Sequence, residues 1–222
     1  MKIITPYVVS AVPNQPLPPP KSLYSLVEAA GRTCYRSERV EGDTTEKFIQ
    51  RLMKRKHWSV LEHAYISLRI VCDRGITHEL VRHRLASYCQ ESTRYCNYSK
   101  GKFGSEITVI DLASGFHYDL NDPKDTAKYN EWMSAMCDAE RHYMKMLELG
   151  ATPEEARSVL PNSTKTEIVA TMNVREWRHF LEMRWVGVAG TPHPQMVEVA
   201  GEVYDLLVMY YPAFFEDIKR AE

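Results

Sequence analysis

The sequence lacks the features that mark several large classes of protein. Its 222 residues contain no run approaching the ~18 consecutive apolar residues of a transmembrane helix. Lysine and arginine number 28 against 29 aspartates and glutamates, a net charge of −1, so the basic excess typical of nucleic-acid binders is missing. The five cysteines include no C-x-x-C pair, which argues against a zinc ribbon and a small disulfide framework. We therefore expect a protein of the reducing cytoplasm, with no membrane and no nucleic acid among its partners.

Glycine-rich nucleotide motifs and metal-binding patterns are missing as well. The sequence has no G-x-G-x-x-G and no P-loop, so any nucleotide would be held by side chains. His78 and His83 flank a segment similar to a zinc-protease helix, but a spacing of five residues puts them about 140° apart around a helix. The sequence therefore predicts no metal site.

What is present is the composition of an ordinary soluble globular protein, with 44% hydrophobic and 26% charged residues. This length and composition predict one domain spanning residues 1–222. Residues 1–12 are typical of a strand and not of a signal peptide. Residues 13–20 hold five prolines and predict a surface loop.

Hydrophobic periodicity predicts an α+β fold. Two or three strands and about six helices do not alternate as βαβ units, which favours a small, mostly antiparallel central sheet flanked by helices. We expect a long helix at about 123–149, opened by Asp122 and Pro123 and closed by Gly150. The other expected strands and helices are strands at 64–71 and 106–112 and helices at 22–31, 44–57, 75–85, 152–161, 173–185 and 194–209.

The densest polar cluster is the segment 82–95, which holds three arginines, a histidine and several hydroxyls. Guanidinium groups suit phosphate because they offer paired donors and stay charged. Arg82 and Arg84 would point about 200° apart on a continuous helix, so for both to reach one ligand the helix should end here. The alternative interpretation is a solvated helix end followed by a polar loop.

Two further segments could carry chemistry. Asn173, Trp177, Phe180 and Arg184 share one face of a helix, an arrangement unusual for pure core, although the polar ends could simply reach solvent. The segment 57–63 places an imidazole and a carboxylate at the mouth of a predicted strand, where a histidine is often only structural.

Together these segments resemble the flavin-dependent thymidylate synthase family. Arg82, His83 and Arg84, then seven residues, then Ser92 and Arg94 match its R-H-R-x7-S-x-R signature. The segment 57–63 resembles its H-x-S/T-x-x-E-H element, the segment 157–161 its R-x-x-L-P stretch, and the segment 173–184 its N-x-R-x3-H/N-x4-R helix. The resemblance covers nearly the whole chain.

The resemblance implies a reductive methylation of dUMP to dTMP. Its carbon donor is 5,10-methylenetetrahydrofolate, and NADPH supplies the hydride through FAD. It also implies a homotetramer in which subunits share the sites.

The resemblance further implies roles for particular residues. Those implied as catalytic are Arg184, His57 and Ser92. Those implied to bind FAD are Ser59, Arg82, His83, Arg84, Gln90, Asn173, Arg175 and His179. Those implied to bind dUMP are Glu79, Arg82, Gln90, Glu91, Ser92, Thr93, Arg94, Arg157 and Arg184.

Three of these positions depart from the pattern of some relatives. Gln90 stands where some have Glu, Thr93 where others have Gly, and Glu79 where others have Gln. A carboxylate at position 79 would repel a phosphate or a uracil oxygen unless a cation such as Arg82 paired with it.

The residue types suit the implied chemistry. Uracil C5 becomes nucleophilic when negative charge on N3, O2 or O4 is stabilised, and a fixed cation such as Arg184 does this without a protein nucleophile. Arg94 and the Ser92 hydroxyl would anchor the nucleotide, and His57 would lie near the flavin and the folate or nicotinamide.

Two other classes of function remain open. A non-catalytic nucleotide or single-stranded nucleic-acid binding module could use the arginines with Tyr88, Tyr95 and Tyr98 as stacking groups. Such a module would purify colourless, whereas a flavoenzyme would be yellow. A different flavin reductase would share the FAD residues but would not bind dUMP tightly.

Overall fold

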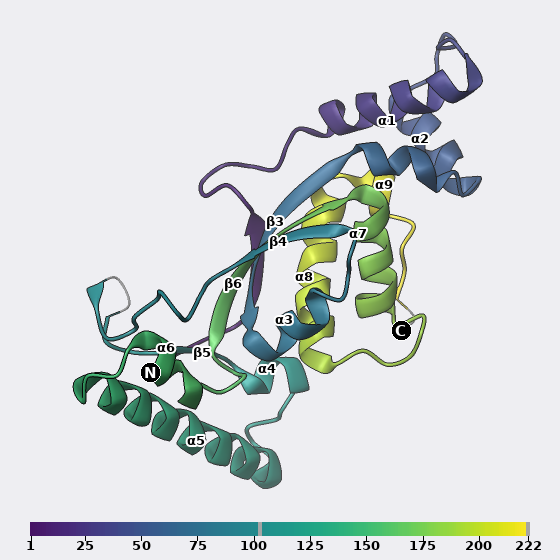
Figure 1. Cartoon of the computed structure of the whole chain (residues 1–222). Coiled ribbons are helices and arrows are strands. Elements are labelled where there is room, and N and C mark those ends of the chain that lie inside the picture. Colours follow the sequence, from purple (N-terminus) through teal and green to yellow (C-terminus); the bar gives the residue numbers. More distant parts are fainter. Residues whose placement is uncertain (102–103, 221–222) are drawn as a thin grey trace. The chain divides into compact units, whose positions relative to one another are not determined.

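The computed structural model describes residues 1–101 and 104–220, and it has the predicted α+β class (Figure 1). The strands are β1 Lys2–Ile4, β2 Tyr7–Ser10, β3 Tyr65–Asp73, β4 Ala86–Gln90, β5 Thr108–Ile110 and β6 Lys165–Asn173. The helices are α1 Pro20–Tyr35, α2 Thr45–Lys54, α3 Arg74–Leu80, α4 Leu112–Phe116, α5 Pro123–Glu148, α6 Pro153–Ala156, α7 Val174–Leu181, α8 Pro194–Tyr210 and α9 Pro212–Phe215. The shorter turns are the 3₁₀ segments η1 Trp58–His63 and η3 Arg157–Val159 and the π-helical segment η4 Glu182–Val186.

The predicted small sheet flanked by helices is confirmed. Four strands lie in the order β2-β3-β6-β4, while β1 and β5 form a separate parallel pair in which Ile3 faces Val109. The prediction of two or three strands is wrong, because the described residues form six. The longest one missed is β6, whose Thr166, Ile168 and Ala170 are fully buried at alternating positions. This period of two was visible in the sequence.

The chain folds as two compact units, each built from three segments. The first unit comprises Met1–Tyr7, Ile70–Leu80 and Cys89–Ile168. The second unit comprises Val8–Arg69, Val81–Tyr88 and Val169–Glu222.

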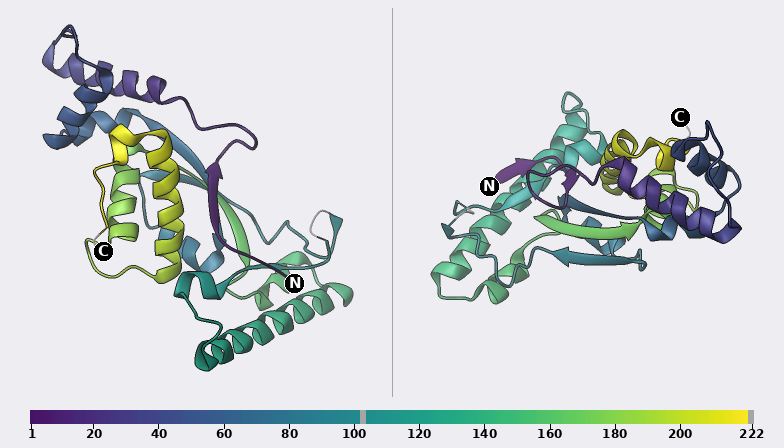
Figure 2. Two further views of the ribbon diagram at one scale, coloured as in Figure 1. Left: turned by 180° about the vertical axis from the view of Figure 1, so that it is seen from behind. Right: turned by 90° about the horizontal axis from the view of Figure 1, so that it is seen from above.

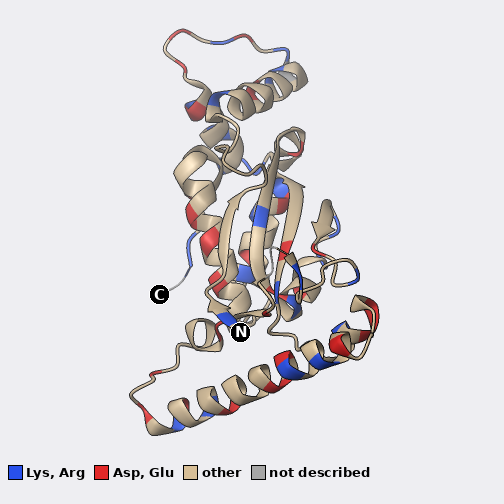
Figure 3. Ribbon diagram, turned by 90° about the vertical axis from the view of Figure 1, so that its left-hand side faces the viewer, with Lys and Arg blue, Asp and Glu red and all other residues tan. Residues whose placement is uncertain are grey.

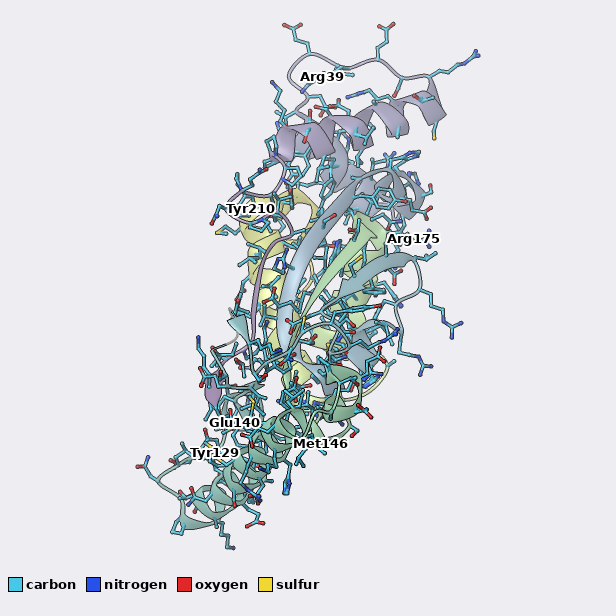
Figure 4. All side chains as sticks on the ribbon, turned by 60° about the vertical axis from the view of Figure 1, so that its left-hand side comes forward. Arg39, Tyr129, Glu140, Met146, Arg175 and Tyr210 are labelled. Carbon is cyan, nitrogen blue, oxygen red and sulfur yellow. The ribbon has the colours of Figure 1, made fainter. Side chains whose placement is uncertain are left out.

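The long helix α5 dominates the first unit. It begins as predicted, since the Asp122 side chain caps it by accepting from the amides of Lys124 and Asp125. Its buried Tyr143 packs against Tyr98, whose amide donates to the Tyr143 hydroxyl over 3.3 Å. Glu140, labelled in Figure 4, accepts from the Ile107 amide at 2.9 Å.

Met136, Trp132 and Leu147 of α5 pack in the same core, and the helix also carries charges of both signs (Figure 3). Across the described part of the chain, no helix combines the length and the apolar character needed to cross a membrane.

The core of the second unit lies beneath α7 and α8, which run side by side (Figures 1 and 2). Trp177 and Phe180 are fully buried, and the Trp177 indole donates to the Ile66 carbonyl at 3.0 Å. The sequence predicts both on one helix face, whose polar ends are unusual for core. They are core residues, and only the ends of that face remain available for chemistry.

One helix boundary was predicted wrongly for a physical reason. Gly31 does not end α1, which continues to Tyr35. A Cβ at Gly31 would lie 2.9 Å from Cε1 of Phe48 on α2, so the glycine permits the close approach of two helices. Its function is packing and not termination.

Candidate functional site

A pocket of about 410 Å³ lies within the second unit, between η1 and α7. Three residues that the family pattern implies for FAD line it: Asn173, Arg175 and His179. Trp58, Glu62 and Glu176 also line it. The pocket therefore brings together side chains from the 57–63 and 173–184 segments.

The strand-to-helix turn at Asn173 positions the α7 side of this pocket. Asn173 is the N-cap of α7, and its Oδ1 accepts from the Glu176 amide at 2.8 Å. The next amide, that of Val174, donates to the Ala64 carbonyl at 2.9 Å and so joins α7 to the chain just before β3. The helix predicted over 173–185 is present as α7, which ends at Leu181 and continues directly as the π-helical η4 to Val186.

An ion pair joins the two walls of the pocket. Nη1 of Arg175, which Figure 4 labels, lies 2.5 Å from Oε1 of Glu62, and both side chains are about half exposed. Glu62 is the carboxylate of the 57–63 segment. Two of the family-like segments thus meet through their charged residues.

A second pocket, of about 380 Å³, shares the lining residues Trp58 and Arg175 with the first. His57 and Ser59 line it, with Lys56 beside them. Trp58 and Arg175 line both pockets, so the predicted site residues His57 and Ser59 share these two walls with Asn173 and His179.

The loop between α3 and β4 carries the three residues of the R-H-R motif. The helix predicted over 75–85 ends earlier, at Leu80, so the predicted C-terminal end is wrong and both arginines lie beyond the helix. Arg82 and Arg84 are exposed, whereas His83 is only 6% exposed. The hydroxyl of Tyr88 donates to the His83 carbonyl at 2.9 Å and fixes the loop backbone.

His83 lies between two charged partners. Its Nδ1 is 3.2 Å from Oε1 of Glu176, and Nε of Arg184 donates to its Nε2 at 3.3 Å. Burial, followed by the positive charge of Arg184, lowers the pKa of His83 to about 4. At neutral pH the imidazole is therefore uncharged, and its contact with Glu176 is a hydrogen bond to a neutral ring. Burial raises the pKa of Glu176.

A metal ion is a conceivable occupant of this cluster. One ligand atom each of His83, Glu176 and His179 lies within 4.8 Å of the others, a set the sequence did not predict. However, Nε of Arg184 already donates to Nε2 of His83. A neutral ring bound to metal through Nδ1 would carry its proton on Nε2, where it would face this donor. The hydrogen-bonded arrangement therefore fits these residues better than a cation.

Arg178 supports the pocket wall and was missed by sequence reasoning. It is 5% exposed, and it donates to the Phe214 carbonyl and to both carboxylate oxygens of Asp217. Its guanidinium carbon lies 5.0 Å from the centre of the Trp58 ring. Asp217 comes from the C-terminal segment, and no local pattern linked it to Arg178.

The residues implied for the nucleotide lie mainly in the first unit. Ser92, Thr93 and Arg94 form a turn in which the Arg94 amide donates to Ser92 Oγ at 3.3 Å. Thr93 is buried, whereas Arg94 is exposed and its Nε lies 2.5 Å from Oε1 of Glu154. Arg157 is exposed at the start of η3.

Gln90, just before this turn in the sequence, belongs to a hydrogen-bonded network. Its Nε2 donates to the hydroxyls of Thr77 and Thr166, each at 3.2 Å. Arg74 Nη1 donates to the same Thr166 hydroxyl and to the Glu91 carbonyl, each at 3.3 Å. The Gln90 amide therefore has a fixed orientation.

The Glu91 carboxylate is engaged on both oxygens. It accepts from the Tyr98 hydroxyl at 2.8 Å and from Lys165 Nζ at 2.9 Å. These three side chains line a pocket of about 210 Å³ in the first unit. Glu79 lies on α3, in the same unit.

Comparison with known proteins identifies the family. Residues 22–213 match the family model described as thymidylate synthase complementing protein. A flavin-dependent thymidylate synthase of Mycobacterium tuberculosis is 34% identical over 202 residues, which cover 88% of this chain and 79% of that protein. The chain therefore belongs to the flavin-dependent thymidylate synthase family.

Two further comparisons show how far the similarity to known proteins extends. A flavin-dependent thymidylate synthase of Pyrococcus furiosus is 34% identical over 148 residues, 66% of this chain, and the match spans only 57% of that relative's length. A solved structure of the UMP/dUMP methylase PolB from Streptomyces cacaoi, bound with 5-Br dUMP, has a TM-score of 0.75 at 23% identity. That match covers 97% of this chain and 96% of the methylase, and it establishes the fold.

Proposed function

We propose that this protein is a flavin-dependent thymidylate synthase that converts dUMP to dTMP. In this proposal 5,10-methylenetetrahydrofolate donates the carbon and NADPH the hydride. The observation that carries it is the meeting of Arg175 with Glu62 at the pocket that Asn173 and His179 also line. These residues come from two segments of the family pattern that are far apart in the sequence.

The donor set of the second unit fits FAD. Asn173, Arg175 and His179 offer an amide, a cation and an imidazole around one pocket, and Ser59 and His57 line the adjoining one. The exposed Arg82 and Arg84 add two cations suited to a pyrophosphate. With His83 and Gln90 they complete the set that we propose binds FAD, which supplies the hydride-transfer chemistry when bound.

In the same proposal, dUMP is bound by the residues implied for it. Arg94 and Arg157 are exposed cations for the phosphate, and the Ser92 hydroxyl positions the nucleotide. The fixed Gln90 amide offers directed hydrogen bonds. The other members of the proposed set are Glu79, Arg82, Glu91, Thr93 and Arg184.

Arg184 has the electrostatic role in the reaction. Its cation stabilises the negative charge that develops on the uracil ring as C5 attacks the carbon unit. The hydrogen bond from Nε to His83 restrains the guanidinium in advance, so little reorganisation is needed during the reaction.

We further propose that the enzyme is a cytoplasmic homotetramer with sites shared between subunits, and that residues 1–222 act as one domain. The family match over residues 22–213 includes segments of both compact units. A pocket of about 410 Å³ lies near the small end of the ~300–1,000 Å³ range of ligand sites, which is compatible with a second subunit completing the site.

Tritium release from C5 of labelled dUMP tests the function. We expect release that requires FAD, NADPH and methylenetetrahydrofolate, each omitted in turn. A flavin-bound protein that releases no tritium would instead favour a different flavin reductase, and tight dUMP binding would argue against that alternative. A protein that purifies colourless and binds no added FAD would favour the non-catalytic binding module.

A further inference from the structure

Glu176 lies at the pocket, outside the roles that the family pattern assigns. It is on the first turn of α7 and is 7% exposed, which is unusual for a glutamate. Its carboxylate has a hydrogen bond to His83, and its interactions with His179 and Arg175 only partly offset the burial that raises its pKa. A carboxylate buried against a neutral ring gains little stability, which favours a functional role for Glu176.

Hydrogen-bond chemistry fixes the state of the ring between them. A neutral imidazole has one N–H donor and one bare nitrogen acceptor. The guanidinium of Arg184 has only donors, so the Nε2 that it contacts must be the bare nitrogen. The proton is therefore on Nδ1, and Oε1 of Glu176 accepts it. Glu176, His83 and Arg184 form one directed chain.

The faces of the ring are also restrained. The ring centroids of His179 and Phe180 lie 5.6 and 5.2 Å from that of His83, both in edge-on arrangements. Packing thus limits tilt of the ring, while the two hydrogen bonds limit its rotation about Cβ–Cγ. Flipping the ring by 180° would place Cδ2–H against the carboxylate and Cε1–H against Arg184, so both hydrogen bonds would be lost.

We propose that Glu176 is a positioning residue that acts through His83 to hold Arg184 in its working orientation. The inference rests on the proposed function, since Arg184 is the group whose cation serves the reaction. Glu176 selects the Nδ1–H form of His83, and that form presents a bare Nε2 to Arg184. Replacing the Glu176 carboxylate removes the preference for the Nδ1–H form of His83. The side chains of His83 and Arg184 themselves stay unchanged.

Two substitutions separate hydrogen bonding from charge. Glu176→Gln keeps an acceptor oxygen for Nδ1–H, and Glu176→Ala removes it. We expect kcat of the alanine variant to fall by about tenfold, less than the loss of ~10²-fold or more expected on removing the stabilising cation itself. The KM for dUMP should change much less, and Glu176→Gln should restore most of kcat.

Glu28→Ala is the matched control. Glu28 is likewise a buried glutamate, 8% exposed, but it pairs with Arg32 on α1 and lies outside both pockets. Its substitution tests whether the loss of any buried carboxylate from the same unit lowers kcat through general destabilisation. We expect a lower melting temperature for this variant, with kcat per folded enzyme unchanged.

A measurement independent of activity completes the test. Nitrogen-15 NMR of labelled histidine, assigned with a His83→Gln variant, distinguishes Nδ1–H from Nε2–H at neutral pH. We expect Nδ1–H in the wild-type protein and in Glu176→Gln, and a mixture or Nε2–H in Glu176→Ala. An unchanged His83 tautomer in Glu176→Ala, or an equal loss of kcat in both variants, would overturn the proposal. A wild-type protein without synthase activity would instead refute the proposed function, and the tautomer shift would still be readable.

Discussion

Arg175 and Glu62 form an ion pair of 2.5 Å between residues 113 positions apart in the sequence. The carboxylate comes from η1 and the guanidinium from the first turn of α7. Because both residues line the pocket, the pair restrains the position of the Arg175 guanidinium there. The position of a proposed cofactor residue thus depends on a distant part of the chain.

Glu62→Gln should weaken flavin binding with little effect on folding. Each side chain is about half exposed, so the pair contributes at most about 1 kcal/mol to stability. Loss of a restraint on this scale corresponds to an increase of up to about fivefold in the FAD dissociation constant. Absorbance titration with FAD and a thermal melt would measure both effects. An unchanged dissociation constant would show that the pair does not position Arg175 for the flavin.

Arg184→Ala should retain the fold and the flavin but lower turnover. The expected loss is at least ~10²-fold, the scale of removing one electrostatic stabiliser from an active site. Steady-state tritium release, with the flavin content measured on the same sample, provides the test. Near-normal turnover would exclude the electrostatic role of this guanidinium.

Ser92→Ala should retain measurable activity. Ser92 Oγ accepts a hydrogen bond from the Arg94 amide, which is consistent with a positioning group. A nucleophilic serine would be required for any turnover at all. Mass spectrometry of the protein after reaction with dUMP distinguishes these roles, and a covalent adduct on Ser92 would contradict ours.

Stability should decrease as the solution is acidified from about pH 6.5 towards about pH 4. Burial lowers the pKa of His83 to about 4, from an unfolded value near 6.5. In this window the unfolded chain binds the proton more strongly than the folded one, so falling pH favours unfolding. Thermal melts at pH 7 and pH 5 would measure the loss. His83→Gln should lose less stability over the same interval, and an equal loss would assign the effect to other groups.

Gly31→Ala should destabilise the packing of α1 on α2. The added Cβ would lie 2.9 Å from Cε1 of Phe48, and such overpacking costs about 1–3 kcal/mol. Gly201→Ala is a matched control on α8, where the nearest atom, Nε1 of Trp185, would be 3.5 Å from the new Cβ. The control should be neutral or slightly stabilising because alanine favours helix. Chemical denaturation of both variants gives the comparison, and equal stabilities would refute the packing role of Gly31.

Structural features that depend on residues close together in the sequence were predictable. Asp122 caps α5 through amides two and three residues away, and Thr152 and Glu155 form a capping box at the start of α6. By contrast, β6 was missed although its buried positions alternate, because Thr166 and Ala170 on the buried face are weakly hydrophobic and Val169 lies on the other face. Gly31 was misinterpreted because its packing partner Phe48 lies on another helix.

The sequence by itself determined the family, the α+β class and the kinds of side chain at the site, because these depend on residue identity and local spacing. Only the tertiary structure decided which charged groups meet. His83 contacts Glu176 across 93 positions and Arg184 across 101 positions of the chain. No periodicity spans such separations, since they are set by how strands pair and how helices pack. The same packing buries His83, and this burial gives the ring the neutral state that its two hydrogen bonds require.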